Sequence, residues 1–390
     1  PKGTNRRNTP ISLDPPGSTF HRRWIKYISY TENVTEMIKI LFFIETLNGG
    51  GAEKVLQNLV NAMDKSEFDI TVQTLYPDKA AKNLADEIKY KYCYPSASGL
   101  NQRVMRLETA FGLTYPRHIK GDYDIEVAYL ECGSTKIMAG STNKKAKKIA
   151  WVHCDLSKKF ADSADFVHKS KNIYDKFDSI VCVSQSVKEG FEKLFGKDER
   201  ISVIYNTVND KEIIRLADAD TVVKTEPTVL AVGRLSKQKR FDRLISAHKK
   251  LIDEGVKHRL MIMGEGVERA PLEKLISDLS LSGSVELIGY RENPYPYIKA
   301  ADVCVCSSDY EGISTFITES LILGKVIVTT DCSGMRELLG NSEFGIITDS
   351  DDKALARGIK ALLTDEALKK SYEEKARKRG EDFSEAQLTQ

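Results

Sequence analysis

Short apolar segments alternate along the chain with longer stretches in which apolar residues recur every three or four positions. The pattern starts at Met37, directly before the apolar segment 38–44. Apolar runs of this length indicate buried strands, and the wider spacing indicates amphipathic helices. Their alternation predicts parallel sheets with helices on both faces. We expect strands near 38–44, 69–75, 124–129, 147–152, 179–183, 201–204, 228–233, 259–263, 285–288, 302–306, 325–329 and 345–347.

The pattern divides the chain into two units of similar size. Residues 210–225 lose the strand pattern and are polar, and Pro227 then precedes a new apolar strand. We expect an α/β fold with two Rossmann-like, doubly wound domains, 37–210 and 211–383, that face a central cleft. Residues 1–36 lack the apolar core of a secretory signal. We interpret them as an N-terminal extension, either an added segment or a native arm that touches a membrane. Residues 384–390 look like the start of a truncated crossover helix.

Composition narrows the range of partners. Hydrophobic residues make up 41% of the 390 residues and charged residues 29%, which is typical of a folded chain with sizeable cores. The net charge of +2 argues against a protein built mainly to neutralise nucleic-acid phosphates. Seven scattered cysteines, none in a zinc-ligand spacing, favour a reducing compartment. No segment approaches the roughly 20 apolar residues that a transmembrane helix needs.

Two turns between a strand and a helix carry candidate anion-binding groups. The first contains Gly50 and Gly51, which allow backbone amides to approach an anion at a helix N-terminus. It lacks the GxGxxG order of dinucleotide folds, and a tight turn is the alternative reading. The second turn places Arg234 at a strand end and Lys239 at a helix start, so both cations can converge on a diphosphate. A solvated basic turn is its alternative.

A third turn holds two glutamates separated by seven residues. Glu311 follows the strand 302–306, and the next helix begins near Ser314 or Thr315, so that Glu319 lies about one turn inside it. Free amides at such a helix start hold ligand oxygens, while the two carboxylates hold hydroxyl groups on either side. A capped surface helix would show the same residues.

Taken together, the three turns resemble those of retaining glycosyltransferases of family four, of the type found in bacterial surface-polysaccharide synthesis. This family has the GT-B fold and carries a Gly-Gly-Ala-Glu turn, a GRLxxxKG segment and an E-x7-E element. The resemblance runs from about Met37 to Phe383. Supporting matches are Trp151-Val152-His153, Val183-Ser184-Gln185-Ser186, Ile204-Tyr205-Asn206, Gly264-Glu265-Gly266, Gly289-Tyr290 and Asn293-Pro294-Tyr295.

The resemblance implies a role for each motif residue. Arg234 and Lys239 hold the donor diphosphate and stabilise the charge on the leaving nucleotide, and Glu319 takes the ribose hydroxyls. Glu311 faces the donor sugar. His153 approaches the sugar from the other domain, although a packed core histidine is the alternative. The donor-binding groups implied by the motifs are Gly50, Gly51, Arg234, Lys239, Gly312, Ile313, Ser314, Thr315 and Glu319.

Three positions depart from the family pattern. Ser314 stands where the family has Pro, Ser320 follows the second glutamate in place of Ala, and Arg240 follows Lys239 in place of Gly. Ser is a good helix cap, so phosphate binding need not suffer. The choice of donor sugar depends on this loop and is left open.

These expectations describe an enzyme that moves a hexose or N-acetylhexosamine from a nucleotide-diphosphate sugar, most simply a UDP-sugar, to a glycan or lipid-linked glycan. No cofactor or metal is expected, because cations face the diphosphate and no DxD pair ends a strand near the site. A sugar-nucleotide epimerase of the same fold and a non-catalytic nucleotide-sugar-binding protein are the alternatives. A dehydrogenase fits least, because no acidic residue ends a second strand at the required distance.

The acceptor side gives a weaker signal. Residues 144–176 contain nine lysines and four aspartates, which is a local charge of +5. This stretch suits contact with an anionic membrane face, and a solvated basic surface is the alternative. We expect a cytoplasmic enzyme that contacts the inner face of the cell membrane peripherally.

Overall fold

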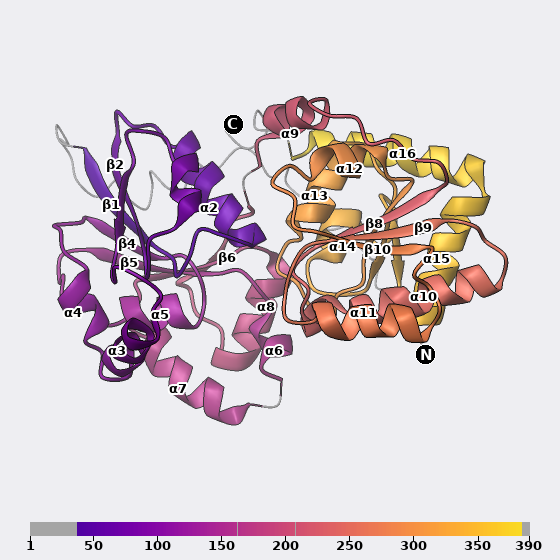
Figure 1. The fold of residues 1–390 in the computed structure, drawn as a ribbon. Coiled ribbons are helices and arrows are strands. Elements are labelled where there is room, and N and C mark those ends of the chain that lie inside the picture. Colours follow the sequence, from indigo (N-terminus) through magenta and orange to yellow (C-terminus); the bar gives the residue numbers. More distant parts are fainter. Residues whose placement is uncertain (1–36, 162, 207, 384–390) are drawn as a thin grey trace, which may run out of the picture.

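The computed structural model describes residues 37–383 except 162 and 207. These residues form two α/β domains that lie side by side (Figure 1). Each domain is built on one sheet whose paired strands are all parallel. The interpretations of residues 1–36 and 384–390 lie outside the described residues.

The sheet of the first domain has the strand order β3-β2-β1-β4-β5-β6-β7. Strand β1 lies inside the sheet between β2 and β4, and its residues Ile40, Leu41, Phe42 and Phe43 are fully buried. Such a continuous apolar run is expected of a parallel strand covered on both faces. The bounds are β1 Ile38–Phe43, β2 Phe68–Thr74, β3 Lys89–Tyr92, β4 Ile125–Ala128, β5 Lys147–Val152, β6 Ser179–Cys182 and β7 Ile201–Val203.

Helices cover both faces of this sheet (Figure 1). Most begin at a side-chain cap, as at Ser184, whose hydroxyl oxygen accepts from the N–H of Val187 at 3.1 Å. They are α2 Gly51–Ala62, the 3₁₀ turn η1 Lys79–Asn83, α3 Gly99–Ala110, α4 Thr114–His118, α5 Gly133–Met138, α6 Leu156–Lys159, α7 Ala164–Tyr174 and α8 Gln185–Phe195.

The second sheet has the strand order β10-β9-β8-β11-β12-β13. Its strands are β8 Thr228–Val232, β9 Arg259–Met263, β10 Val285–Gly289, β11 Val303–Cys306, β12 Ile327–Thr330 and β13 Ile346–Thr348. Its helical elements are α9 Asp210–Ala217, η2 Lys237–Lys239, α10 Phe241–Asp253, α11 Arg269–Asp278, α12 Tyr295–Ala300, α13 Thr315–Ile322, α14 Met335–Leu339, α15 Asp352–Thr364 and α16 Glu366–Glu381.

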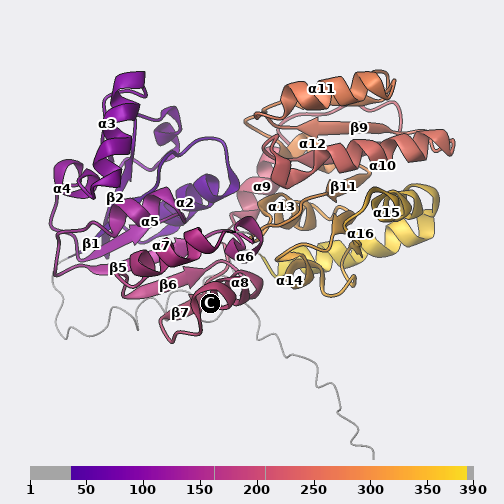
Figure 2. The ribbon, with the colours of Figure 1, turned by 90° about the horizontal axis from the view of Figure 1, so that it is seen from below.

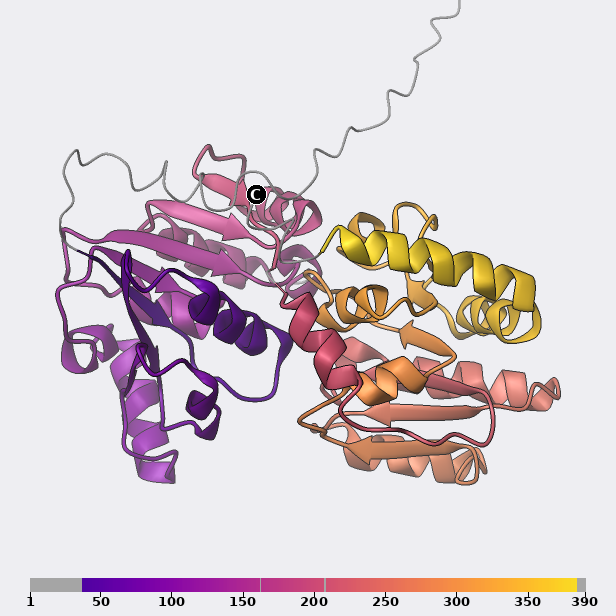
Figure 3. The same ribbon diagram turned by 90° about the horizontal axis from the view of Figure 1, so that it is seen from above.

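Separate apolar clusters hold the two faces of the second sheet. One joins residues of α10, α11 and α15, and the other joins residues of α9, α12, α13, α14 and α16. Helix α9 occupies the polar segment in which the sequence shows no strand, and Ile213 and Ala217 anchor it to the second cluster. It lies at the junction of the two domains (Figure 3).

All of the predicted strands are present, with ends that differ by at most two residues. Strand β3 is an addition that sequence analysis missed. Its sequence, Lys-Tyr-Lys-Tyr, puts exposed lysines on an edge strand with little apolar burial, so no apolar run marks it. In the described part of the chain, no helix has the length and apolar character needed to cross a membrane.

Candidate active site

Loops of the two domains meet at the carboxyl ends of β5 and β11. The backbone N–H of Asp155 donates to the carbonyl of Glu311 at 3.2 Å. A side chain at Gly312 would place its Cβ 2.0 Å from the carbonyl oxygen of His153. Only glycine therefore permits this close approach, and the loop that carries the predicted glutamate lies against the first domain.

The predicted Gly-rich turn lies against the same region from the other side. A Cβ at Gly51 would lie 2.8 Å from Oγ1 of Thr315, the first residue of α13. A Cβ at Gly50 would collide with the carboxylate of Glu53 at 2.2 Å. The structure thus brings the N-termini of α2 and α13 together, where Gly51 permits the close approach, whereas Gly50 leaves room for the Glu53 carboxylate.

A buried ion pair joins two of the predicted residues. Lys239 Nζ donates to Glu311 Oε1 at 2.6 Å, and Ser308 Oγ donates to the same oxygen at 2.5 Å. Burial alone would lower the pKa of Lys239, but the Glu311 carboxylate outweighs it and raises the pKa above its ordinary value. Lys239 is therefore a fixed cation at the carboxyl end of β8.

Arg234 reaches across the domain boundary rather than toward Glu311. Its Nη2 donates to the carbonyl of Gly49 at 3.3 Å and lies 3.6 Å from Glu53 Oε1. Burial raises the pKa of Glu53, while its own backbone N–H and Arg234 partly offset that rise. Lys239 lies close by, because its Cε would be 3.1 Å from a Cβ at Gly233. The Lys239 side chain thus passes Gly233, the residue directly before Arg234, while the Arg234 guanidinium lies at the first domain.

Glu319 lies one turn inside α13 and is almost fully buried. Its Oε1 accepts from the hydroxyl of Tyr295 at 3.0 Å and from Nζ of Lys54 at 3.1 Å. Lys54 comes from α2 of the first domain, and its ammonium also donates to the Tyr295 hydroxyl. Burial, and then the Glu319 carboxylate, raise the pKa of Tyr295. Glu319, the carboxylate predicted to bind the ribose, thus forms an ion pair with Lys54 of the other domain.

The start of α13 follows the sequence prediction closely. Ser314 is the N-cap, and its hydroxyl oxygen accepts from the N–H of Ile317 at 3.4 Å. Serine therefore caps the helix at the position where the family has Pro. Ile313 packs against apolar residues of both domains. This anchors the loop that presents the first amides of the helix.

His153 is part of an aromatic group at the end of β5. Its ring centroid lies 4.7 Å from that of Tyr129 and 6.2 Å from that of Trp151. Its Nε2 is shielded from solvent and has no hydrogen-bond partner among the described residues. Burial lowers its pKa to about 4, although Glu131 opposes this shift. The imidazole is therefore neutral at pH 7 and packed, yet it retains one unused polar atom.

Two family models match consecutive parts of the chain. The model described as Glycosyltransferase Family 4 matches residues 49–212, and the model described as Glycosyl transferases group 1 matches residues 214–379. The chain belongs to the family-four glycosyltransferases. The two parallel-sheet domains are those of the GT-B fold.

The names of several relatives of this glycosyltransferase describe enzymes of bacterial glycan synthesis. One is N-acetylgalactosamine-N,N'-diacetylbacillosaminyl-diphospho-undecaprenol 4-alpha-N-acetylgalactosaminyltransferase of Campylobacter jejuni, 27% identical over 90% of this chain and 97% of the relative. Another is lipopolysaccharide core biosynthesis glycosyltransferase LpsE of Rhizobium meliloti, 33% identical over 49% of this chain and 56% of the relative. Among solved structures, Anabaena HepE in complex with UDP and glucose has a similar fold, with a TM-score of 0.70 over 89% of this chain and 96% of that one. The two sequences are 20% identical.

Sequence analysis missed a polar group of the glycosyltransferase beside His153. Buried Glu131 accepts from the backbone N–H of His153 at 3.0 Å, from Sγ of Cys154 at 3.0 Å and from Nζ of Lys159 at 3.2 Å. Burial opposes ionisation of Glu131, but Lys159 and these donors hold its pKa below the ordinary value. The residues come from two loops and from the end of α6, so no motif spacing marks them. Lys54 was missed for the same reason, although it directly follows the predicted turn.

Arg240 shows why the family has glycine at this position. Its backbone is left-handed, with φ 49° and ψ 43°, which favours glycine. The guanidinium pairs with Asp242 at 3.0 Å and with Asp309 at 3.3 Å. Arg240 lies between η2 and α10 of the glycosyltransferase. Its side chain forms two ion pairs there, although its backbone conformation is strained for arginine.

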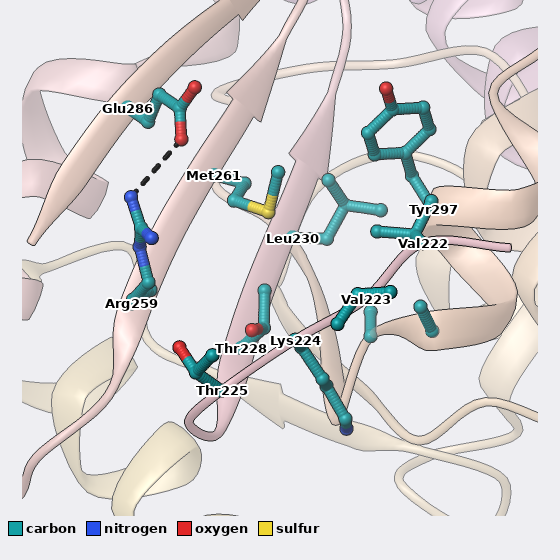
Figure 4. Close-up of a pocket in the computed structure, with 12 residues that line it drawn as sticks. Val222, Val223, Lys224, Thr225, Thr228, Leu230, Arg259, Met261, Glu286 and Tyr297 are labelled. Carbon is teal, nitrogen blue, oxygen red and sulfur yellow. Dashed lines mark hydrogen bonds and ion pairs between the residues drawn. The ribbon is translucent and has the colours of Figure 1, made fainter.

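A separate cavity of about 220 Å³ lies in the second domain (Figure 4). It is lined by Leu230, Met261 and Tyr297 together with the segment 222–225. None of the residues that line the cavity belongs to the candidate site. One lining residue, Thr228, lies at the amino end of β8. Ligands of such sheets bind at carboxyl ends, so this cavity is not the donor site. In the described part of the glycosyltransferase, no three His, Cys, Asp or Glu side chains are grouped to hold a metal ion.

Proposed function

We propose that this glycosyltransferase moves a hexose or N-acetylhexosamine from a UDP-sugar to a lipid-linked glycan and retains the anomeric configuration. The proposed binding of the donor is supported mainly by the positions of the two motif glutamates. Glu311 is paired with Lys239 at 2.6 Å, and Glu319 lies in the neighbouring helix beside Tyr295. A cation and two carboxylates are thus fixed around the N-terminus of α13, which itself favours an anion.

In this proposal the diphosphate binds where Lys239, Arg234 and the first amides of α13 meet. The Lys239 side chain lies against Gly233 at the carboxyl end of β8, and Arg234 directly follows that glycine. Fixed cations stabilise the charge that develops on a leaving diphosphate, and this kind of stabilisation is commonly the largest catalytic contribution. Because these side chains neutralise the leaving group, we propose that transfer needs no divalent metal.

Glu319 serves the ribose in this proposal. The contact with Lys54 then has to open, because the ribose hydroxyls and the ammonium compete for one carboxylate. Donor binding would exchange a bond between the domains for one to the ligand. Glu319 keeps the neutral hydroxyl of Tyr295 as a second partner, which positions the carboxylate throughout.

Retention is proposed to proceed by front-face displacement. Glu311 already accepts from Lys239 and Ser308, which makes it a poor covalent nucleophile. The leaving phosphate oxygen then accepts the proton of the attacking acceptor hydroxyl as the sugar passes through an oxocarbenium-like state. The neutral His153, with its unused Nε2, is the group from the first domain proposed to contact the sugar.

The acceptor class is proposed from the relatives. The Campylobacter jejuni relative is named for an undecaprenol-diphosphate-linked substrate, and the Rhizobium meliloti relative for the lipopolysaccharide core. We extend this to a lipid-linked glycan and to a cytoplasmic enzyme at the inner membrane face. The lysine-rich stretch 144–176 stays a prediction of membrane contact. Three of its lysines, Lys147, Lys159 and Lys169, pair with carboxylates.

The test has two stages. UDP-sugars are first screened for thermal stabilisation, because a ligand at 100 times its Kd stabilises the folded state by about 2.7 kcal/mol. The donor found is then labelled in the sugar and incubated with and without a lipid-linked acceptor extract. Acceptor-dependent transfer supports the proposal. Conversion of the sugar without an acceptor would indicate an epimerase, and binding without any conversion would indicate a non-catalytic protein.

A matched pair of variants ties the activity to the site. Lys239→Ala removes the paired cation, whereas Lys237→Ala removes an exposed lysine two residues away in the same turn. We expect transfer to fall about tenfold to a hundredfold in the first variant, which corresponds to roughly 1.4–2.8 kcal/mol of transition-state stabilisation. Equal activity of the two variants would contradict the assignment.

A further inference from the structure

Helix α8 of the first domain begins against helix α14 of the second domain (Figure 2). Its first two backbone N–H groups, those of Gln185 and Ser186, each donate to one carboxylate oxygen of Glu337 in α14 at 2.8 Å. The hydroxyl of Tyr205, which follows β7 of the first domain, donates to Oε2 of the same carboxylate at 3.1 Å. Three donors of one domain thus hold a single carboxylate of the other. We call these four residues the α8 clasp.

The clasp completes the capping of α8 from the other domain. The first N–H groups of a helix have no partner within it, and a carboxylate suits the positive end of the helix dipole. Ser184 serves the third and fourth of these groups, because its hydroxyl accepts from Val187 and its carbonyl from Lys188. Glu337 takes the first two. Burial, and then the Glu337 carboxylate, raise the pKa of Tyr205, so its hydroxyl stays protonated and remains a donor at pH 7.

The segment that leads into α14 also encloses the loop that precedes α13. Ser333 Oγ donates to Oδ2 of Asp155 in the first domain at 2.6 Å. A Cβ at Gly334, next along the chain, would lie 2.0 Å from the carbonyl oxygen of Gly312. From the first domain, the hydroxyl of Ser184 donates to the same carbonyl oxygen at 3.4 Å. The loop at Gly312 is therefore held between the start of α14 and the start of α8.

This loop is where the proposed donor site meets the first domain. Gly312 lies against the carbonyl of His153, and the first amides of α13 follow the loop directly. In the proposed reaction the contact between Lys54 and Glu319 opens when the ribose binds. The carboxylate of Glu337, by contrast, binds groups that the proposal assigns to no ligand. The α8 clasp can therefore stay closed while the donor is bound and the sugar is transferred.

We propose that Glu337 is a positioning residue of the transfer reaction: by holding the start of α8, it fixes the donor site of the second domain against His153 of the first. The inference deepens the proposed function and rests on it. Glu337 touches neither donor nor acceptor in this account and acts through α8 and the loop at Gly312. The groups proposed to bind UDP lie in the second domain, so loss of the clasp slows transfer without weakening UDP binding.

The test compares kcat for transfer with the affinity for UDP in variants of the full chain. Glu337→Gln keeps the shape of the side chain but loses its charge and one acceptor oxygen, whereas Glu337→Ala removes all three contacts. Because a misplacement of about 1 Å can cost about a hundredfold in rate, we expect kcat to fall about tenfold in Glu337→Gln and further in Glu337→Ala. The KM for the donor and the Kd for UDP should stay at the wild-type values.

Controls separate the clasp from a general effect on the fold. Glu343→Gln removes an exposed carboxylate of the same domain and should change neither quantity. Tyr205→Phe should lower kcat less than Glu337→Ala does, and it should add nothing to Glu337→Ala, because the hydroxyl then has no carboxylate to bind. Glu337→Gln and Tyr205→Phe give the measurement if Glu337→Ala does not fold. An unchanged kcat in the Glu337 variants, an equal loss of UDP affinity, or full additivity with Tyr205→Phe would overturn the proposal.

Hydrogen exchange of the full chain tests the clasp without donor or acceptor. We expect the amides of Gln185 and Ser186, and those of the loop 311–314, to exchange faster in Glu337→Ala than in the wild type or in Glu343→Gln. Unchanged exchange in both segments would overturn the proposal. If exchange rises as expected but the wild type transfers sugar to no acceptor, the proposed function fails, and the clasp stands as the contact that holds this loop.

Discussion

Removal of the positive charge of Lys239 tests the buried pair at the centre of the donor site. The two charged groups are 2.6 Å apart, and their side chains are 21% and 9% exposed. At an effective dielectric constant of about 20, their gross attraction is about 6 kcal/mol. Much of this offsets the cost of desolvating both groups. Lys239→Met keeps the apolar stem and leaves the Glu311 carboxylate without its cation.

Loss of one partner of a buried pair costs about 3–5 kcal/mol. For a domain of this size, 1 kcal/mol corresponds to roughly 2–4 °C in Tm, so we expect Lys239→Met to lower Tm by about 6–20 °C. The double variant Lys239→Met/Glu311→Gln carries neither charge, and we expect it to regain at least about 2 kcal/mol. Stability is measured by denaturant unfolding, with Lys237→Met as the control.

The transfer rate should follow a different pattern from stability. Glu311→Gln restores a compatible partner for the methionine, but it does not restore a cation at the diphosphate. We therefore expect the double variant to be folded and at least about tenfold slower than wild type. A single variant as stable as wild type, or a double variant no more stable than the single one, would refute the reasoning about the pair.

Three further outcomes follow from the described contacts. Glu319→Gln should weaken binding of UDP about tenfold in calorimetry, as expected for a lost hydrogen bond to a charged group. Glu311→Gln should leave UDP affinity nearly unchanged. Equal losses of UDP affinity in the two variants would contradict the division of roles. Arg240→Gly should be about 1 kcal/mol more stable to denaturant than Arg240→Ala, because only glycine relieves the left-handed backbone; equal stability would count against strain at this residue. Burial lowers the pKa of His248 to about 3, so the unfolded chain binds the extra proton and stability should fall as the pH drops below roughly 6.5. His248→Gln should flatten that slope, and exposed His168→Gln should not; an unchanged slope in His248→Gln would refute the cause.

The strands were predictable because a parallel strand buried on both faces is apolar along its whole length. Residues 40–43 of β1 show this in the first sheet, where they follow the exposed Lys39. Strand β3 was not predictable in this way, since Lys89 and Lys91 are exposed at the sheet edge and Tyr90 alone is half-buried. The cap at Ser314 was predictable, because a hydroxyl at a loop-to-helix boundary acts locally.

The contacts between distant parts of the chain were not predictable from motifs. Lys54 pairs with Glu319, 265 residues further along, and nothing in the spacing of either residue indicates the other. Arg234 was expected to join Lys239 on one ligand, and among the described residues its partners are Gly49 and Glu53 of the other domain. Such pairs depend on how two domains meet, which local patterns do not encode. The motif residues set the site, and domain contacts set which of them are already occupied.

The most direct test of the proposed reaction is proton NMR of the product formed from an alpha-linked UDP-sugar and a lipid-linked acceptor. The chemistry proposed for Lys239, Arg234 and Glu311 requires the new bond to form on the face from which the diphosphate leaves. We therefore predict an alpha-linked product, formed at an unchanged rate after chelation of divalent metals. A beta-linked product would contradict retention and the front-face displacement at this site.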